Sequence, residues 1–180
     1  MKEQKISRRY ARALYDIAKD NKILTEVNDD LIFIDKMVNS SKEFLMFLKS
    51  PIISKFKKKE VLVALLKDKI QSITLNFILL LNDKQRESLL LDIIAQYENI
   101  YNEEHNIQKI IITTALEQNE EFKQNIIKKL TDWSGKVINA EFIVDKKIIG
   151  GILIRKDNWV YDATISHQLE LLKQKLLYGN

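Results

Sequence analysis

The fold is decided by the stretch Ile148-Ile149-Gly150-Gly151-Ile152-Leu153-Ile154, which places two of the chain's four glycines side by side. Upstream of it, residues 1–134 contain no glycine and only one proline, Pro51. A chain without glycine has little access to positive φ angles, so we expect this region to be helical. The doublet lies between β-branched residues, where a strand pair needs positive φ or close backbone approach. The sequence therefore predicts a mainly α protein with a small α/β C-terminal domain.

The N-terminal domain, residues 1–105, is predicted to be a six-helix bundle, because apolar residues recur at helical spacing between short polar loops. Ser50-Pro51 should end the third helix, since proline lacks an N–H and disfavours a helical residue before it. The fifth helix is apolar nearly all round and should be central or covered by another chain. The first expected helix covers 7–21 with Ser7 as N-cap, and the second follows Thr25. The third covers 43–49 after Ser40 or Ser41, and the fourth begins at Ser54. The fifth covers 72–82, and the sixth ends near Glu104.

The C-terminal domain, residues 106–180, is predicted to alternate strands and helices. The last helix repeats Ile165, Leu169, Leu172 and Leu176 at spacings of four, three and four, which suits packing against another helix. The strand that contains the doublet should return after a turn at 145–147. The expected elements are strands 107–114, 137–144, 148–155 and 159–161, a turn at 157–158, a helix over 119–133, and a final helix capped by Asp162 or Thr164.

Composition excludes several classes of function. There is no cysteine, which excludes disulfides, thiolate metal sites and cysteine nucleophiles. The net charge of +4 arises from 29 basic and 25 acidic side chains, so we expect a mixed, solvated surface. The longest apolar run, 77–81, is far shorter than the roughly 20 residues of a membrane span. With no apolar signal core at its start, the chain is expected to be soluble and intracellular, reaching membranes only through partners.

No set of residues predicts catalysis, a metal or a cofactor. The two histidines, His105 and His167, lack a second ligand at helical spacing. The doublet Gly150-Gly151 lacks the spacing of a phosphate-binding loop, so a backbone-packing role is expected. Acidic pairs such as Asp29-Asp30 are expected on polar helix faces, which argues against paired-carboxylate chemistry.

Basic residues leave one alternative open, a helical nucleic-acid-binding or regulatory protein. It would require Arg8, Arg9 and Arg12 to form one exposed cluster with the lysines of 55–59. For that lysine segment, a solvated helix face is the simpler interpretation. Salt would distinguish the two, because phosphate binding weakens steeply with ionic strength and apolar docking does not.

Four segments, taken in order, resemble the delta subunit of bacterial F-type ATP synthase, the counterpart of the mitochondrial oligomycin-sensitivity-conferring protein. Residues 9–18 resemble its first-helix motif, and 47–58 its helix-breaking segment. Residues 76–86 resemble its fifth helix, except that Gln85 stands where the family usually has glycine. The last segment, 149–172, resembles its C-terminal signature. The resemblance covers nearly the whole chain.

The resemblance implies a non-catalytic subunit of the peripheral stalk (stator) in a bacterial enzyme. Such a subunit fastens the catalytic alpha/beta head to the b-subunit stalk, so that the head resists rotor torque during proton-driven ATP synthesis. It would lie on the cytoplasmic side of the inner membrane, attached peripherally through the complex. Neither nucleotide nor nucleic acid would bind to it directly.

The resemblance also implies two sets of partner-binding residues. N-terminal helices of alpha subunits would bind between the first and fifth helices, at Tyr10, Ala13, Leu14, Ile17, Asn76, Phe77, Leu80 and Leu81. Core packing explains Leu14 and Leu80 at least as well. The C-terminal end of the b subunit would bind the last helix, at Ile165, Leu169, Leu172 and Leu176. These four could equally pack on strands 107–114 and 148–154.

Overall fold

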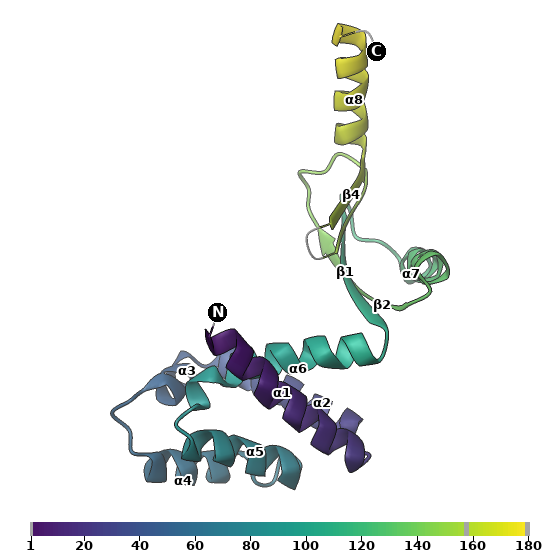
Figure 1. Ribbon diagram of the computed structural model, residues 1–180. Helices are drawn as coiled ribbons and strands as arrows, with labels where there is room; N and C mark the ends of the chain where they lie inside the picture. The colour runs from purple at the N-terminus through teal and green to yellow at the C-terminus, as the bar shows by residue number, and fades with distance from the viewer. Residues whose placement is uncertain (1, 157–158, 179–180) are drawn as a thin grey trace. The chain divides into compact units, whose positions relative to one another are not determined.

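The computed structural model describes residues 2–156 and 159–178 and divides into two compact units, Met1–Tyr101 and Asn102–Asn180. The expected turn at 157–158 lies outside the described residues. Helices dominate, and a four-stranded sheet follows the helical part (Figure 1), which confirms the mainly α fold class with a small α/β C-terminal part.

The N-terminal unit is a helical bundle around one apolar core. All four apolar positions expected on the second helix, Val27, Leu31, Ile34 and Val38, are buried in it. Helices α4 and α5 pack side by side, and Figure 1 shows them together in the bundle. The elements are α1 (Lys2–Asp20), α2 (Leu24–Ser40), α3 (Lys42–Lys49), α4 (Lys55–Leu66), α5 (Ser72–Asp83), the 3-10 turn η1 (Glu87–Leu89) and α6 (Leu90–Glu104).

Serine caps begin two of these helices as expected. The Ser41 hydroxyl accepts a hydrogen bond from the Phe44 backbone N–H at 3.1 Å, and α3 ends at the extended residue Ser50. Ser54 caps α4 in the same way. The expected cap at Ser7 is wrong, because α1 already begins at Lys2 and Ser7 is completely buried inside it. Its hydroxyl faces the bundle core and has no hydrogen-bond partner there.

Left-handed residues end helices in this glycine-free unit, contrary to the expectation that the unit would avoid positive φ. Lys22 and Gln85 have φ angles of 58° and 56°. After α5, the Arg86 N–H donates to the Leu81 carbonyl at 2.8 Å and the Gln85 N–H to the Asn82 carbonyl at 3.0 Å. This pair of bonds is a Schellman motif, which usually places glycine where Gln85 stands. Its two hydrogen bonds offset the steric cost of a left-handed side chain.

The lysines of α4 do not all lie on a solvated face, contrary to the expectation from the sequence. Lys58 is buried, and its ammonium donates to the Leu48 carbonyl at 2.9 Å and to the Glu87 carboxylate. These bonds connect α3, α4 and η1 in a buried ion pair. A periodicity argument misses such a pair because a charged residue is assigned to solvent unless a partner from another element is known.

The C-terminal unit is a four-stranded mixed sheet with two helices. The strand order is β2-β1-β3-β4; β1 pairs with β2 in parallel, and the other pairs are antiparallel. Strands β1 and β2 have the predicted bounds. The elements are β1 (Ile107–Thr114), α7 (Glu120–Ser134), β2 (Val137–Val144), β3 (Gly151–Lys156), β4 (Trp159–Thr164) and α8 (Ile165–Tyr178).

The expected return of the third strand onto the second is wrong. Strand β3 begins at Gly151 rather than at residue 148, and it pairs with β1 instead of β2. The parallel β1–α7–β2 unit places β2 at the sheet edge, so the chain crosses to the free side of β1. A short turn signal at 145–147 predicts a reversal of direction, but it does not reveal which neighbour the next strand will choose.

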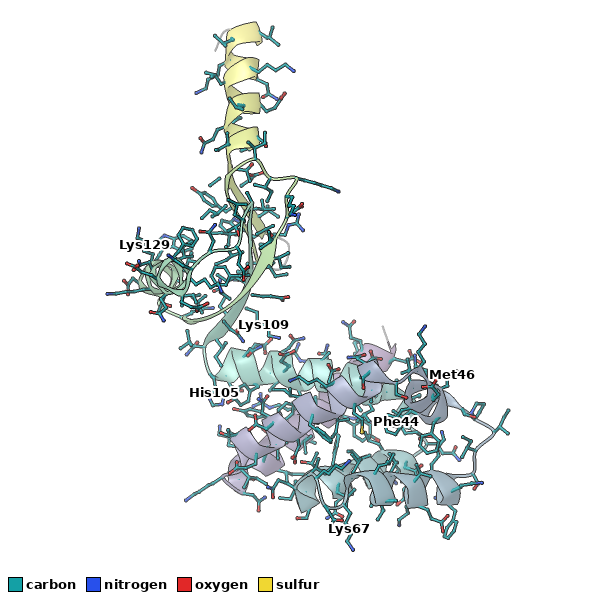
Figure 2. All side chains as sticks on the ribbon, turned by 180° about the vertical axis from the view of Figure 1, so that it is seen from behind. Phe44, Met46, Lys67, His105, Lys109 and Lys129 are labelled. Atoms are coloured by element: carbon teal, nitrogen blue, oxygen red, sulfur yellow. The ribbon has the colours of Figure 1, made fainter. Side chains whose placement is uncertain are left out.

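One face of the sheet carries the core of the C-terminal unit. The registers place Ile110, Ile112, Ile138 and Ile154 on the same face, and these four are buried. Side chains of α7 pack on them, and Figure 1 shows α7 beside the sheet. In Figure 2, Lys129 lies on the side of α7 away from the sheet. Trp133, near the end of α7, is 77% exposed.

Candidate functional site

Helices α1 and α5 meet through two aromatic side chains of the expected alpha-subunit site. The rings of Tyr10 and Phe77 are in edge-to-face contact, with centroids 6.4 Å apart and an interplanar angle of 68°. Tyr10 is half-buried, and Phe77 is almost completely buried. The contact marks the place where the surfaces of α1 and α5 adjoin.

The other six expected residues are divided between core and surface. Of the two residues that could equally have closed the core, Leu14 is completely buried, whereas Leu80 is 45% exposed. Ile17 is 47% exposed, so each helix presents one large aliphatic side chain to solvent. The buried residues are Leu14 and Leu81; the exposed residues are Ala13, Ile17, Asn76 and Leu80.

Buried polar side chains hold α5 at both ends. At its beginning, the Asp30 carboxylate of α2 accepts hydrogen bonds from the Gln71 N–H at 2.8 Å and the Thr74 hydroxyl at 2.6 Å. A carboxylate at a helix N-terminus satisfies free N–H groups and complements the helix dipole. Near its end, the Asn82 amide donates to the Lys55 carbonyl at 2.9 Å. These bonds position the helix that carries half of the candidate site.

Sequence reasoning missed Asp30 and Asn82, and it placed Asp30 on a polar face. A signal was present for the aspartate, because Asp30 lies three residues after Val27 and four before Ile34, in line with the buried stripe of α2. For Asn82 no comparable signal exists. The residue belongs to a polar stretch that is typical of a loop, and only its contact with α4 explains its burial.

Helix α8 is the second candidate surface. Its four expected residues are all exposed, from 43% for Ile165 to 78% for Leu176. Leu171 and Leu177 are exposed as well. Of the two alternatives left open by the sequence, packing on 148–154 applies to Ile165, whose side chain lies close to Gly150, whereas Leu169, Leu172 and Leu176 are more than half exposed. Figure 1 shows α8 extending from the end of β4.

Hydrogen bonds at the junction of β4 and α8 fix the start of this helix. The Thr164 hydroxyl accepts from the His167 N–H at 3.2 Å, which confirms Thr164 as the N-cap. The Asp162 carboxylate in turn accepts from the Thr164 N–H at 2.9 Å. The hydrogen bonds from Thr164 and, secondarily, the charge of His167 lower the pKa of Asp162 below its usual value.

The glycine doublet lies against the same junction. Gly151 has a φ of +83°, and a Cβ there would overlap the Ala163 carbonyl and lie 2.9 Å from the Thr164 Cα. A Cβ on Gly150 would lie 2.6 Å from the Ile165 Cδ1. The Ile165 N–H donates to the Gly150 carbonyl at 3.0 Å. Gly151 therefore serves close backbone packing, as expected, whereas Gly150 makes room for the end of the Ile165 side chain. The doublet joins β3 to the first turn of α8.

The face of α1 and α5 and the seam of α8 are suited to apolar docking. No group of three or more His, Asp or Glu side chains that could hold a metal occurs within residues 2–156 and 159–178. Over the same residues, no helix is long and apolar enough to span a bilayer. The basic cluster required for nucleic-acid binding loses Lys58 to a buried ion pair, and the Arg12 guanidinium lies 3.2 Å from the Asp16 carboxylate.

Comparison with known proteins agrees with the order of these features. The family model described as ATP synthase delta (OSCP) subunit matches residues 6–176. ATP synthase subunit delta of Chlorobaculum tepidum is 32% identical over 171 residues, covering 95% of this chain and 94% of that protein. The Clostridium botulinum (strain Loch Maree / Type A3) subunit delta is 34% identical over 172 residues, covering 96% of each.

A solved structure shows the same fold. One chain of the Toxoplasma gondii mitochondrial ATP synthase hexamer superposes with a TM-score of 0.73 at 22% identity, covering 97% of this chain and 98% of that one. The matches confirm the expected role as a peripheral-stalk subunit of F-type ATP synthase. They do not support the nucleic-acid-binding alternative. The chain belongs to the ATP synthase delta (OSCP) subunit family.

Proposed function

We propose that this chain is a non-catalytic connector that joins the catalytic head to the stalk through two apolar surfaces. The face of α1 and α5 around Tyr10 and Phe77 binds N-terminal helices of alpha subunits. The exposed seam of α8 binds the C-terminal end of the b subunit. Through this complex the chain is held peripherally at the cytoplasmic side of the bacterial inner membrane.

The job is mechanical, because the head would turn with the rotor unless it were fastened. Helices docked on apolar surfaces resist such a torque through buried area, without any chemistry. A surface that is already formed loses little ordering entropy when its partner binds. The hydrogen bonds that hold α5 at both ends favour such a preformed surface.

The observation that carries the proposed binding of alpha subunits is the Tyr10–Phe77 ring pair with exposed residues on both helices. Ala13 and Ile17 lie one and two turns beyond Tyr10 on α1, and Leu80 lies one turn beyond Phe77 on α5. The small side chain of Ala13 lets a third helix approach closely. Its neighbours Ile17 and Leu80 supply apolar area.

The test is a calorimetric titration of the full chain with a peptide from the N-terminus of the alpha subunit. We expect 1:1 binding that Ala13→Asp abolishes, because the partner would bury an unpaired charge. The matched control is Ala64→Asp, the same change at an exposed position of α4. Leu172→Asp on α8 should also leave this titration unchanged. Equal affinities for the parent chain and Ala13→Asp would contradict the site.

A further inference from the structure

The loop between α3 and α4 exposes apolar side chains that neither proposed contact uses. Ile52 lies in this loop and is 92% exposed, more than any other large apolar side chain among the described residues. Met46 of α3 is 71% and Phe56 of α4 is 69% exposed. In Figure 1 the connection from α3 to α4 runs along the outside of the bundle. Three such side chains within residues 46–56 indicate an interaction surface, whereas single exposed ones would not.

Hydrogen bonds hold this loop at both ends. At the end of α3, the Leu48 carbonyl accepts from the Lys58 ammonium at 2.9 Å. At the start of α4, the Ser54 hydroxyl accepts from the Lys57 N–H at 3.3 Å. Between the two ends, the ring of Pro51 restricts the backbone further. The exposed apolar side chains therefore belong to a loop whose course is fixed by its own unit.

Lysines accompany these apolar side chains. The segment 42–59 contains six lysines and one acidic residue, so its charge of +5 exceeds the +4 of the whole chain. Lys58 is buried against Glu87, and the Lys55 ammonium lies 3.7 Å from the Asp83 carboxylate. The other four lysines, which are all exposed, are Lys42, Lys49, Lys57 and Lys59. A partner for this surface should therefore be both apolar and negatively charged.

A polar hollow of about 290 Å³ lies between the loop and η1. Its lining includes Lys49 together with the hydroxyl residues Ser50 and Ser88. The Lys58–Glu87 pair also lines it, and the two charges of that pair offset each other. Ammonium and hydroxyl groups donate hydrogen bonds to phosphate oxygens. The hollow can therefore hold a phosphate group beside the exposed apolar side chains.

Lysine, and not arginine, supplies the positive charge of this surface. No arginine occurs between Arg12 and Arg86. Protein interfaces are enriched in arginine and depleted in lysine, and nucleic-acid sites commonly combine arginine with stacking aromatic side chains. Lysine clusters beside apolar side chains are instead typical of surfaces that bind anionic lipids. A bilayer is also fluid, so it accepts separate apolar side chains at any spacing, whereas a folded partner would need a matching pocket for each.

We propose that the loop between α3 and α4 binds the surface of a bilayer that contains anionic lipid. Ile52 and Phe56 enter the boundary between the headgroups and the acyl chains, while the exposed lysines bind lipid phosphates. This contact is direct, in addition to the proposed attachment through the complex. It uses neither the α1–α5 face nor the α8 seam.

The test measures co-sedimentation of the full chain with vesicles of neutral phosphatidylcholine, alone or mixed with anionic phosphatidylglycerol. We expect binding only to the anionic vesicles. Ile52→Asp should weaken this binding roughly tenfold or more, because a charge replaces the apolar side chain at the tip of the loop. Leu176→Asp on α8 is the matched control, since it also replaces an exposed aliphatic side chain, and it should leave the binding unchanged.

A second pair of variants tests the lysines. Lys57→Gln combined with Lys59→Gln should weaken binding about thirtyfold, or roughly fivefold for each lysine near the anionic surface. The control is Lys146→Gln combined with Lys147→Gln, which removes the same charge from an exposed turn of the other unit. The control pair should have less than about a threefold effect, because salt screens charges beyond the contact.

Insertion is distinguished from adsorption by a fluorophore at the tip. Phe56→Trp provides one, and lipids that carry bromine on their acyl chains should quench its emission. The parent chain is the control, because its two tryptophans, Trp133 and Trp159, belong to the other unit and should not be quenched. Ile52→Asp should also leave the calorimetric titration with the alpha-subunit peptide unchanged, so this proposal and the proposed function can fail separately.

Four results would overturn the proposal. The first is that anionic vesicles bind the chain no better than neutral ones, and the second is unchanged binding by Ile52→Asp. The third is an emission of Phe56→Trp that brominated lipid does not quench, which would leave only charge-driven adsorption. The fourth is tighter binding to polyglutamate than to anionic vesicles, which would make an acidic protein the partner.

Discussion

In the N-terminal unit, one cluster of buried apolar side chains draws on every helix from α1 to α6, whereas the buried cluster of the C-terminal unit consists of Ile110, Ile112, Ile138 and Ile154. Partly buried side chains surround both clusters. Most of the large apolar side chains after residue 130 remain exposed, including those of β4 and α8. The N-terminal unit thus has a closed core, in which the helices cover one another's apolar side chains. The C-terminal unit has an open core, because many of its large apolar side chains remain exposed.

The difference shows which unit depends on partners for its burial. An exposed apolar patch on a soluble protein usually marks an interaction site. In the N-terminal unit such residues are scattered over α1 to α5 and the loop before α4. They are Ile17, Ile32, Phe33, Met46, Ile52, Phe56, Leu65 and Leu80. In the C-terminal unit they extend along α8 and occur on both faces of the sheet, as Trp159 and Tyr161 on one face and Ile111, Ile143 and Val160 on the other. We therefore expect the first unit to be stable alone and the second to gain stability in the complex.

The largest change in the free energy of unfolding should come from truncating a buried side chain of the N-terminal core. Ile78 is completely buried on α5, so Ile78→Ala should lower the free energy of unfolding by about 2–5 kcal/mol. Leu176→Ala on α8 removes a side chain that is 78% exposed and should change it by less than about 0.5 kcal/mol. Urea unfolding followed by far-UV circular dichroism, which reports mainly on the helices, measures both variants.

The same urea unfolding of both variants can also be followed by tryptophan emission. Both tryptophans belong to the C-terminal unit, so their transition should stay at the parent urea concentration in Ile78→Ala. A large destabilisation by Leu176→Ala would contradict the comparison, since it would mean that α8 is packed in the free subunit.

The second contrast concerns the glycines of the C-terminal unit. Gly151→Ala should cost roughly 2–5 kcal/mol, because the new methyl group would overlap the Ala163 carbonyl in addition to requiring positive φ. Gly135→Ala is the matched control. Gly135 ends α7 with φ +67°, but its Cβ would meet nothing within 4 Å, so only the left-handed cost of about 1–2 kcal/mol applies.

Tryptophan emission during urea unfolding measures this pair, since both glycines belong to the unit that carries the tryptophans. Equal effects of the two changes would show that the β4 backbone moves away easily from Gly151. The doublet would then be less constrained than its contacts indicate.

Periodicity predicted most elements, because a buried helix face repeats every three or four residues within one segment. It therefore placed Leu31 and Ile34 correctly, as well as the cap Ser54, and it narrowed the cap of α3 to Ser40 or Ser41, of which the structure selects Ser41. Strand order was not predictable in this way, since β3 selects β1 through hydrogen bonds between segments about 40 residues apart.

Buried charges are the second class of misses. Lys58 and Asp30 lie on α4 and α2, and their partners Glu87 and Thr74 come from η1 and α5. Within a single helix, a charged residue predicts a solvated position. Only the assembled bundle provides the carboxylate, carbonyl or hydroxyl that stabilises the buried group.

The third contrast concerns the helix ends of the glycine-free N-terminal unit. Here the expected change in the free energy of unfolding is the smallest. Gln85 holds a left-handed φ of 56° in the Schellman motif after α5. Glycine takes this conformation without a clash between Cβ and the following carbonyl. Gln85→Gly should therefore raise the free energy of unfolding by about 0.5–1 kcal/mol, since the larger entropy of the unfolded glycine chain offsets part of the relief.

The neighbouring residue is its control. Lys84 has an ordinary φ of −88°, so Lys84→Gly relieves no strain and should lower the free energy of unfolding by a similar amount. Urea unfolding followed by far-UV circular dichroism measures both changes. Stabilisation by Gln85→Gly alone would show that the N-terminal unit tolerates a strained residue because its core is closed. Destabilisation would mean that the glutamine side chain contributes more to this turn than its backbone conformation costs.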